Sequence, residues 1–159
     1  MITDMTDMTE DYENALKLGE KSYRQEIIHG RYPYLPALEE MLRNRDRLRE
    51  ENIGLCEIPI ALICGTLTKG RQEAFAKNYM PLLSEDSEFA MKWINLLAYQ
   101  EREGITDAVK AHEFMGRFYI SEGNKRVSVL KYLKQPDILR SVTFAHSLVI
   151  NRPQNPVVK

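Results

Sequence analysis

A strand-type segment that ends in a glycine and is followed at once by a helix-type pattern constrains this chain more than any other feature. Residues 118–121 are predicted to form a strand, and Gly123 lets the chain turn sharply and lets a ligand approach the backbone. From Asn124 to Leu133 the apolar residues recur at helical spacing. The sequence therefore predicts a strand, a glycine turn and a helix, with Asn124 as the N-cap of that helix.

Two cations, Lys125 and Arg126, occupy the first turn of this predicted helix. The helix dipole disfavours cations there by roughly 0.3 to 1 kcal/mol each. An anion at the helix N-terminus reverses this, because free N–H groups, the dipole and both side chains then converge on it. The sequence predicts a phosphate-binding site at residues 123–126. The alternative is that both cations are solvated and pair with Glu122 or Glu113.

A polar loop upstream, residues 65–71, is a candidate for a second wall around the phosphate. Its candidate ligand-binding residues are Thr66, Thr68, Lys69 and Arg71. A loop of this composition is equally compatible with a purely connecting role.

The patterns around the glycine turn indicate an α+β fold with a small mixed sheet flanked by helices. Residues 55–62 nearly alternate, which predicts a strand, and residues 108–114 are predicted to pair with 118–121 as a hairpin. An amphipathic helix is predicted between N-caps at 84–87 and a stop at Gly104, and a last strand within 138–150.

The first 52 residues are predicted to form a helical hairpin. One helix begins at a Thr9 cap and ends at His29-Gly30; the second begins at Pro36 and carries an apolar stripe as far as Leu48. This predicts an N-terminal helical extension at 1–52, a main domain at 53–150, and a tail or linker at 151–159. The hairpin is also a candidate dimer contact.

Charge and composition exclude several classes of protein. Lys and Arg total 22 against 23 Asp and Glu, so the net charge gives no general attraction to DNA or to anionic membranes. No run approaches the roughly 20 apolar residues of a membrane span, and a cytoplasmic location is expected. Cys56 and Cys64 are expected to be buried thiols, and His29, His112 and His146 lack metal-ligand spacing.

Residues 107–111, a hairpin, and then residues 117–129 together resemble the core of the ParB/sulfiredoxin-like superfamily. In that family a Gly-x-x-Arg turn and the following helix hold nucleotide phosphates, and here Gly123 and Arg126 occupy those positions. Gly104 and Ile105 match the family's earlier glycine and apolar residue. The whole chain also resembles a ParB-like module found with BMP-type substrate-binding proteins in firmicute bacteria.

The resemblance implies a nucleotide ligand of the CTP or ATP class, with Mg²⁺ as a companion of a triphosphate. Sulfiredoxins carry a reactive cysteine after the glycine, whereas this chain has Asn124, so peroxiredoxin repair is not expected. The chain continues only about 30 residues beyond the turn with no recognition helix, so sequence-specific DNA reading is not expected.

Three functions are compatible with these patterns. The first, a nucleotide- or phosphate-binding regulatory domain without catalysis, is the preferred one. The second is a phosphotransferase or nuclease-like enzyme that uses Glu122 as a catalytic base, the only acid beside the glycine. The third is a non-catalytic interaction module in which Lys125 and Arg126 contact an acidic partner or a nucleic-acid backbone.

Overall fold

The structure, a computed structural model, describes residues 5–42, 48–70, 72–104, 108–134 and 143–150. It combines helices with a five-stranded mixed sheet of strand order β1-β5-β3-β4-β2. The α+β class and the mixed sheet expected from the sequence are therefore confirmed. The helices are α1 (Met5–Ile28), α2 (Leu38–Met41), α3 (Glu88–Glu103) and α4 (Asn124–Tyr132); the strands are β1 (Leu48–Cys56), β2 (Ile63–Thr66), β3 (Lys110–Phe114), β4 (Arg117–Glu122) and β5 (Thr143–Ile150).

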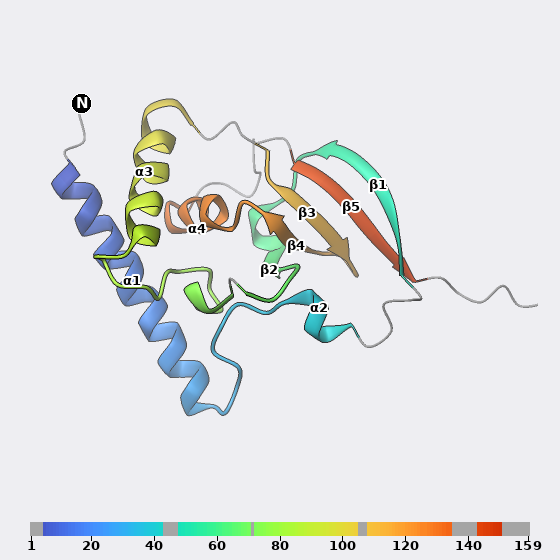
Figure 1. The fold of residues 1–159 in the computed structure, drawn as a ribbon, viewed down its shortest axis with the longest axis horizontal. Coiled ribbons are helices and arrows are strands. Elements are labelled where there is room, and N and C mark those ends of the chain that lie inside the picture. Colours follow the sequence, from blue (N-terminus) through green and yellow to red (C-terminus); the bar gives the residue numbers. More distant parts are fainter. Residues whose placement is uncertain (1–4, 43–47, 71, 105–107, 135–142, 151–159) are drawn as a thin grey trace, which may run out of the picture.

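Helices α1, α3 and α4 form a stack beside one end of the sheet. In Figure 1, α4 lies between α3 and the strands, and α1 runs along the outer side of α3. The paired β1 and β5 extend away from the helices. No helix in the described part of the chain combines the length and the apolar character that a membrane crossing requires.

The hairpin of β3 and β4 is confirmed. The two strands are antiparallel, and Met115 and Gly116 both have positive φ, as a tight two-residue turn demands. β2 pairs with β4 in parallel on one side, and β5 pairs with β3 in parallel on the other. The last expected strand is therefore also present, as β5.

The predicted amphipathic helix corresponds to α3. The Ser87 hydroxyl oxygen accepts a hydrogen bond from the amide of Ala90 at 3.1 Å, and Gly104 ends the helix at a φ of 78°. Trp93 and Leu97 are fully buried against the rest of the core. A local cap and a local apolar stripe were enough to predict this element.

The predicted N-terminal helical hairpin is wrong. Its first helix exists as α1 and begins earlier, at Met5, but the described residues of the second form only the single turn Leu38–Met41. The chain becomes a strand at Leu48, because β5 supplies the backbone hydrogen bonds of an antiparallel ladder there. The expected boundary between residues 52 and 53 consequently lies inside β1, and β1 belongs to the same sheet as the rest of the fold.

The strand predicted at residues 55–62 is also wrong. β1 ends at Cys56, and a 3₁₀ turn covers Ile60–Leu62 before β2 begins. Pro59 has no N–H for a ladder, but its carbonyl accepts from the amide of Leu62 at 3.0 Å. Ile58 and Ile60 are buried as the alternation suggested, and an irregular chain achieves this without sheet pairing.

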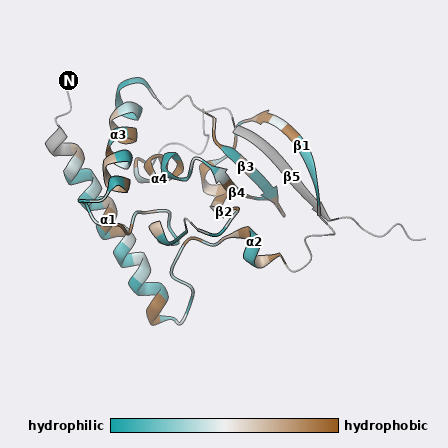
Figure 2. Cartoon of the chain, viewed as in Figure 1, coloured by the Kyte–Doolittle hydropathy of each residue, from teal (hydrophilic) through white to brown (hydrophobic). Residues whose placement is uncertain are grey.

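Helix α1 is tied to the same core. The Tyr12 ring packs edge-on against Trp93 at 5.4 Å, and its hydroxyl donates to the carbonyl of Leu83 at 2.6 Å. Gly19 lets the helix approach the backbone of Pro81 so closely that a Cβ at residue 19 would clash. Figure 2 shows hydrophilic residues along much of α1 with hydrophobic positions between them, as expected for a helix that buries one side.

Candidate functional site

A cavity of about 1510 Å³ opens where β4 passes into α4. Both walls expected from the sequence contribute to it, the glycine turn at 123–126 and the loop after β2. Arg71 lies outside the described residues. The side chains and backbone that line the cavity belong to Tyr34, Thr66, Thr68, Lys69, Gly70, Glu73, Ala74, Phe75, Leu83, Phe89, Lys92, Asn95, Leu96, Tyr99, Ser121, Glu122, Gly123, Asn124, Lys125 and Arg126.

Gly123 is required at the turn for two reasons. Its φ of 112° lies in the left-handed region, where residues with a side chain are strained. A Cβ on this residue would lie 2.6 Å from Cγ1 of Val109, so the strand-to-helix connection has no space for one. The glycine thus allows α4 to begin directly against β3.

The predicted N-cap is displaced by one residue. Gly123 is the N-cap, and Asn124 is the first helical residue. The Asn124 side chain makes no capping bond because it is used in tertiary contacts with Tyr79 and Thr66. The amide of Val127 donates to the Gly123 carbonyl at 3.1 Å, which is the first bond of α4. The preceding amides lie at the start of the helix, where no earlier turn supplies carbonyls.

The two cations of the first turn are held by neighbouring groups. Lys125 Nζ lies 5.4 Å from the centroid of the Phe89 ring on α3. Arg126 donates from Nη1 to the Ala108 carbonyl at 2.8 Å. Both side chains are half-buried. Their positions beside the start of α4 are therefore fixed by packing.

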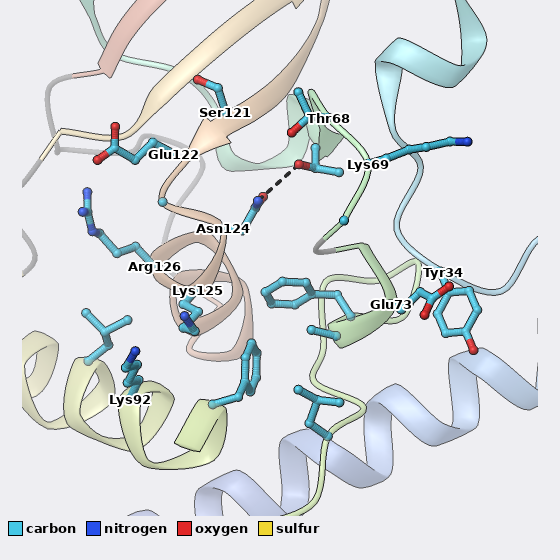
Figure 3. Close-up of a pocket in the computed structure, with 18 of the residues that line it drawn as sticks. Tyr34, Thr68, Lys69, Glu73, Lys92, Ser121, Glu122, Asn124, Lys125 and Arg126 are labelled. Atoms are coloured by element: carbon cyan, nitrogen blue, oxygen red, sulfur yellow. Dashed lines mark hydrogen bonds between the residues drawn. The ribbon is translucent and has the colours of Figure 1, made fainter. Parts of the chain in front are cut away.

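Helix α3 adds a third cation, Lys92, which the sequence interpretation missed. Figure 3 shows Lys92 and Lys125 on the same side of the cavity. The ammonium group of Lys92 lies 3.0 Å from Glu88, and this contact lowers the pKa of Glu88, with a smaller contribution from Lys125. Helical spacing from Phe89 to Lys92 to Leu96 was the signal that could have placed Lys92 at the cavity.

The loop wall contributes less charge than expected. Lys69 extends away from the cavity toward α2 (Figure 3) and forms an ion pair with Glu40 at 3.1 Å. Thr66 is buried, and its hydroxyl donates to the Ile120 carbonyl at 3.1 Å. Thr68 is exposed at the cavity mouth. The loop therefore lines part of the cavity, but Lys69 points toward Glu40 and not into the cavity.

Glu122 has the surroundings of a surface carboxylate. Its side chain is 62% exposed and forms an ion pair with Lys110 at 3.1 Å. A general base has to reach a substrate proton in an environment that tunes its basicity. An exposed carboxylate with a cationic partner gives little support to that role.

Part of the remaining lining is apolar and aromatic. The rings of Phe75 and Phe89 meet edge-to-face at 5.3 Å, and Tyr34 and Tyr99 also line the space. Phe89 lies beside the cations, since Lys125 Nζ is 5.4 Å from its ring centroid, whereas Tyr34 lies on the opposite side of the cavity in Figure 3. One cavity therefore presents both kinds of surface.

The described residues do not offer a site for a protein-bound magnesium ion. Glu73 and Glu122, the two carboxylates of the lining, stand on opposite sides of the cavity in Figure 3. No group of three or more His, Cys, Asp or Glu side chains suited to a metal occurs within the described ranges. A magnesium ion arriving with a triphosphate would be held by the phosphates rather than by a carboxylate pair.

The fold and the site together define an α+β protein with a cationic cavity at the N-terminus of a helix. No family model matches the chain, and no match was found among the curated proteins or the solved structures.

Proposed function

We propose that this protein binds a nucleotide or another phosphate compound, with the phosphate at the N-terminus of α4, and acts as a regulatory binding domain. The observation that carries the proposal is that Lys92, Lys125 and Arg126 all line the cavity near the start of that helix. The order of hairpin, glycine turn and helix supports placing the chain in the ParB/sulfiredoxin-like superfamily.

The electrostatics of the helix start favour an anion. Outward-pointing amides and the helix dipole present a partial positive charge, and no acidic residue lies in the first turn of α4. Lys125 and Arg126 add full charges where the dipole alone would disfavour them. A phosphate group removes this conflict and gains charge-assisted hydrogen bonds.

The size and lining of the cavity favour a ligand larger than phosphate. Small-molecule pockets usually measure about 300 to 1,000 Å³, and this open cavity reaches about 1510 Å³. Its aromatic side chains offer faces on which a planar base can stack. A nucleotide would use both the cationic and the aromatic part.

Calorimetric titration with CTP, ATP, GTP and inorganic phosphate, with and without magnesium, tests the proposal. We expect binding that weakens as the salt concentration rises. Lys125→Met should weaken it by about tenfold or more, the size of one charge-assisted hydrogen bond.

Lys69→Met is the matched control for this test. It removes the same charge from another lysine of the lining, but one that points toward Glu40. We expect it to leave the affinity within about twofold. If the wild-type protein binds none of the four compounds, or if both variants lose affinity equally, the phosphate site is not at α4.

A further inference from the structure

Tyr79 has a backbone conformation that is unusual for an aromatic residue. Its φ is 70°, in the left-handed region, and its side chain is only 1% exposed. Such a conformation is strained for a residue with a side chain and persists where the surroundings fix it. The contacts of the Tyr79 side chain therefore indicate the role of this strained conformation.

The hydroxyl of Tyr79 reaches the candidate phosphate site. It faces two acceptors, the carbonyl oxygen of Gly65 at 2.8 Å and Oδ1 of Asn124 at 2.9 Å, and its single proton is shared between them. Gly65 is in β2, and Asn124 is the first residue of α4. One hydroxyl thus contacts both walls of the cavity.

Asn124 continues this connection. Its Nδ2 donates to the Thr66 hydroxyl at 3.3 Å, and that hydroxyl donates to the Ile120 carbonyl of β4 at 3.1 Å. Figure 3 shows the bond from Asn124 crossing from the start of α4 to the strand beside it. Both polar atoms of the Asn124 side chain, Oδ1 and Nδ2, have partners in the protein. We therefore expect Asn124 to stabilise the start of α4 rather than to bind the ligand directly.

We infer that Tyr79 is a positioning residue of the phosphate site, which through Asn124 and Thr66 fixes the start of α4 against the end of β2. The inference rests on the proposed function. An anion site at a helix N-terminus depends on where the first amides point, and a change of about 1 Å in such geometry is costly. Tyr79 lines no part of the cavity, so its effect passes through Asn124.

The surroundings of Tyr79 suit this role. Burial raises its pKa well above the ordinary value of 10, so the hydroxyl keeps its proton at all physiological pH values. Lys131 of α4 lies over the ring, with Nζ 5.4 Å from the centroid, and Phe75 packs beside it. Phenylalanine would preserve these ring contacts and remove only the hydroxyl. Tyr79→Phe therefore tests the hydroxyl contacts alone.

Tyr132→Phe is the matched control. Tyr132 also lies in contact with the core, and its hydroxyl donates to Asp11 at 2.6 Å, at the far end of α4 from the cavity. Both variants lose one hydroxyl bond, so both should lower stability by similar amounts. Only Tyr79→Phe should disturb the site.

The experiment is a titration of isotope-labelled protein with inorganic phosphate and with ATP, followed by NMR, together with amide exchange in the free protein. We expect Tyr79→Phe to weaken binding by about fivefold, the effect of one hydrogen bond, and to speed exchange of the Val127 amide, which donates to the Gly123 carbonyl at the start of α4. Tyr132→Phe should do neither. A Tyr79→Phe protein with wild-type affinity and wild-type exchange overturns the inference.

The design separates this inference from the proposed function. If the wild-type protein binds neither compound, the phosphate site fails, and the exchange data alone decide whether Tyr79 fixes the start of α4. If the wild-type protein binds and both variants weaken binding equally, the site stands and the specific role of Tyr79 is overturned.

Discussion

The indole Nε1–H of Trp93 donates to the Ser128 hydroxyl oxygen at 2.9 Å, and neither side chain is exposed to solvent. This bond joins α3 to α4 in the middle of the core. Lys92 precedes Trp93 in sequence, and residues 125 and 126 lie three and two residues before Ser128. The contact therefore also joins the two helices that carry the cations of the cavity.

Ser128→Ala should destabilise the protein by about 1 to 3 kcal/mol, because it leaves the buried indole N–H without its acceptor. Denaturant unfolding measures this, and Trp93, the single tryptophan of the chain, gives the fluorescence signal. Ser121→Ala removes an exposed hydroxyl and should change stability by less than about 0.5 kcal/mol. Equal effects of the two substitutions would contradict the importance of the buried bond.

Gly123→Ala should destabilise the protein more than Gly70→Ala. Both residues have strongly positive φ, 112° and 117°, so both substitutions strain the backbone. Only residue 123 would also clash with Val109, since nothing lies within 4 Å of a Cβ at residue 70. Overpacking of this kind adds about 1 to 3 kcal/mol. Thermal unfolding of both variants gives the difference.

Truncating the partner side chain checks the cause of that difference. In a Gly123→Ala background, Val109→Ala should cost less stability than it does alone, because the shortened side chain relieves the clash. Additive effects of the two substitutions would show that Val109 is not the obstacle.

Glu122→Gln should leave ligand affinity unchanged or tighten it by up to about threefold. The substitution removes a negative charge from the lining of a cavity proposed to bind an anion. Its ion pair with Lys110 is exposed at the surface, where such pairs contribute roughly 0 to 1 kcal/mol. Calorimetry with the best ligand of the wild-type protein gives the affinity. A wild-type protein that turns the ligand over, and a Glu122→Gln variant that does not, would instead establish Glu122 as the base of an enzyme.

Stability should fall in alkaline solution because of Tyr12. Burial raises the pKa of Tyr12 to about 12, against an ordinary value of 10. A raised pKa means that the folded state binds the proton more tightly, so this contribution is complete below pH 10 and is lost between about pH 10 and 12. Thermal unfolding from pH 8 to 11.5 should show the loss, and Tyr12→Phe should reduce it. An identical pH profile for the variant would exclude Tyr12 as a cause.

The glycine turn, the β3–β4 hairpin and helix α3 could be predicted because their signals are local. A residue with a side chain is strained at the φ of Gly123, Ser87 caps its own helix, and the apolar stripe through Trp93 lies on one helical face. Each signal acts within a few residues, so the order of side chains along the chain contains it.

The N-terminal region could not be predicted because its conformation depends on distant partners. Residues 48–56 form a strand only because β5, almost a hundred residues later, supplies the ladder. Ile58 and Ile60 alternate as a strand would, yet they reach the core from an irregular segment and a 3₁₀ turn.

For the site, the sequence by itself determined which residues stand at the start of α4, since a glycine followed by two cations is a local pattern. Only the tertiary structure decided how they are used. Lys92 of α3 lines the cavity, Lys69 forms an ion pair with Glu40, and the Asn124 side chain contacts the Tyr79 hydroxyl. Ion pairs and hydrogen bonds between segments depend on distances in space. These distances are set when the core packs, so they cannot be predicted from the linear order of residues.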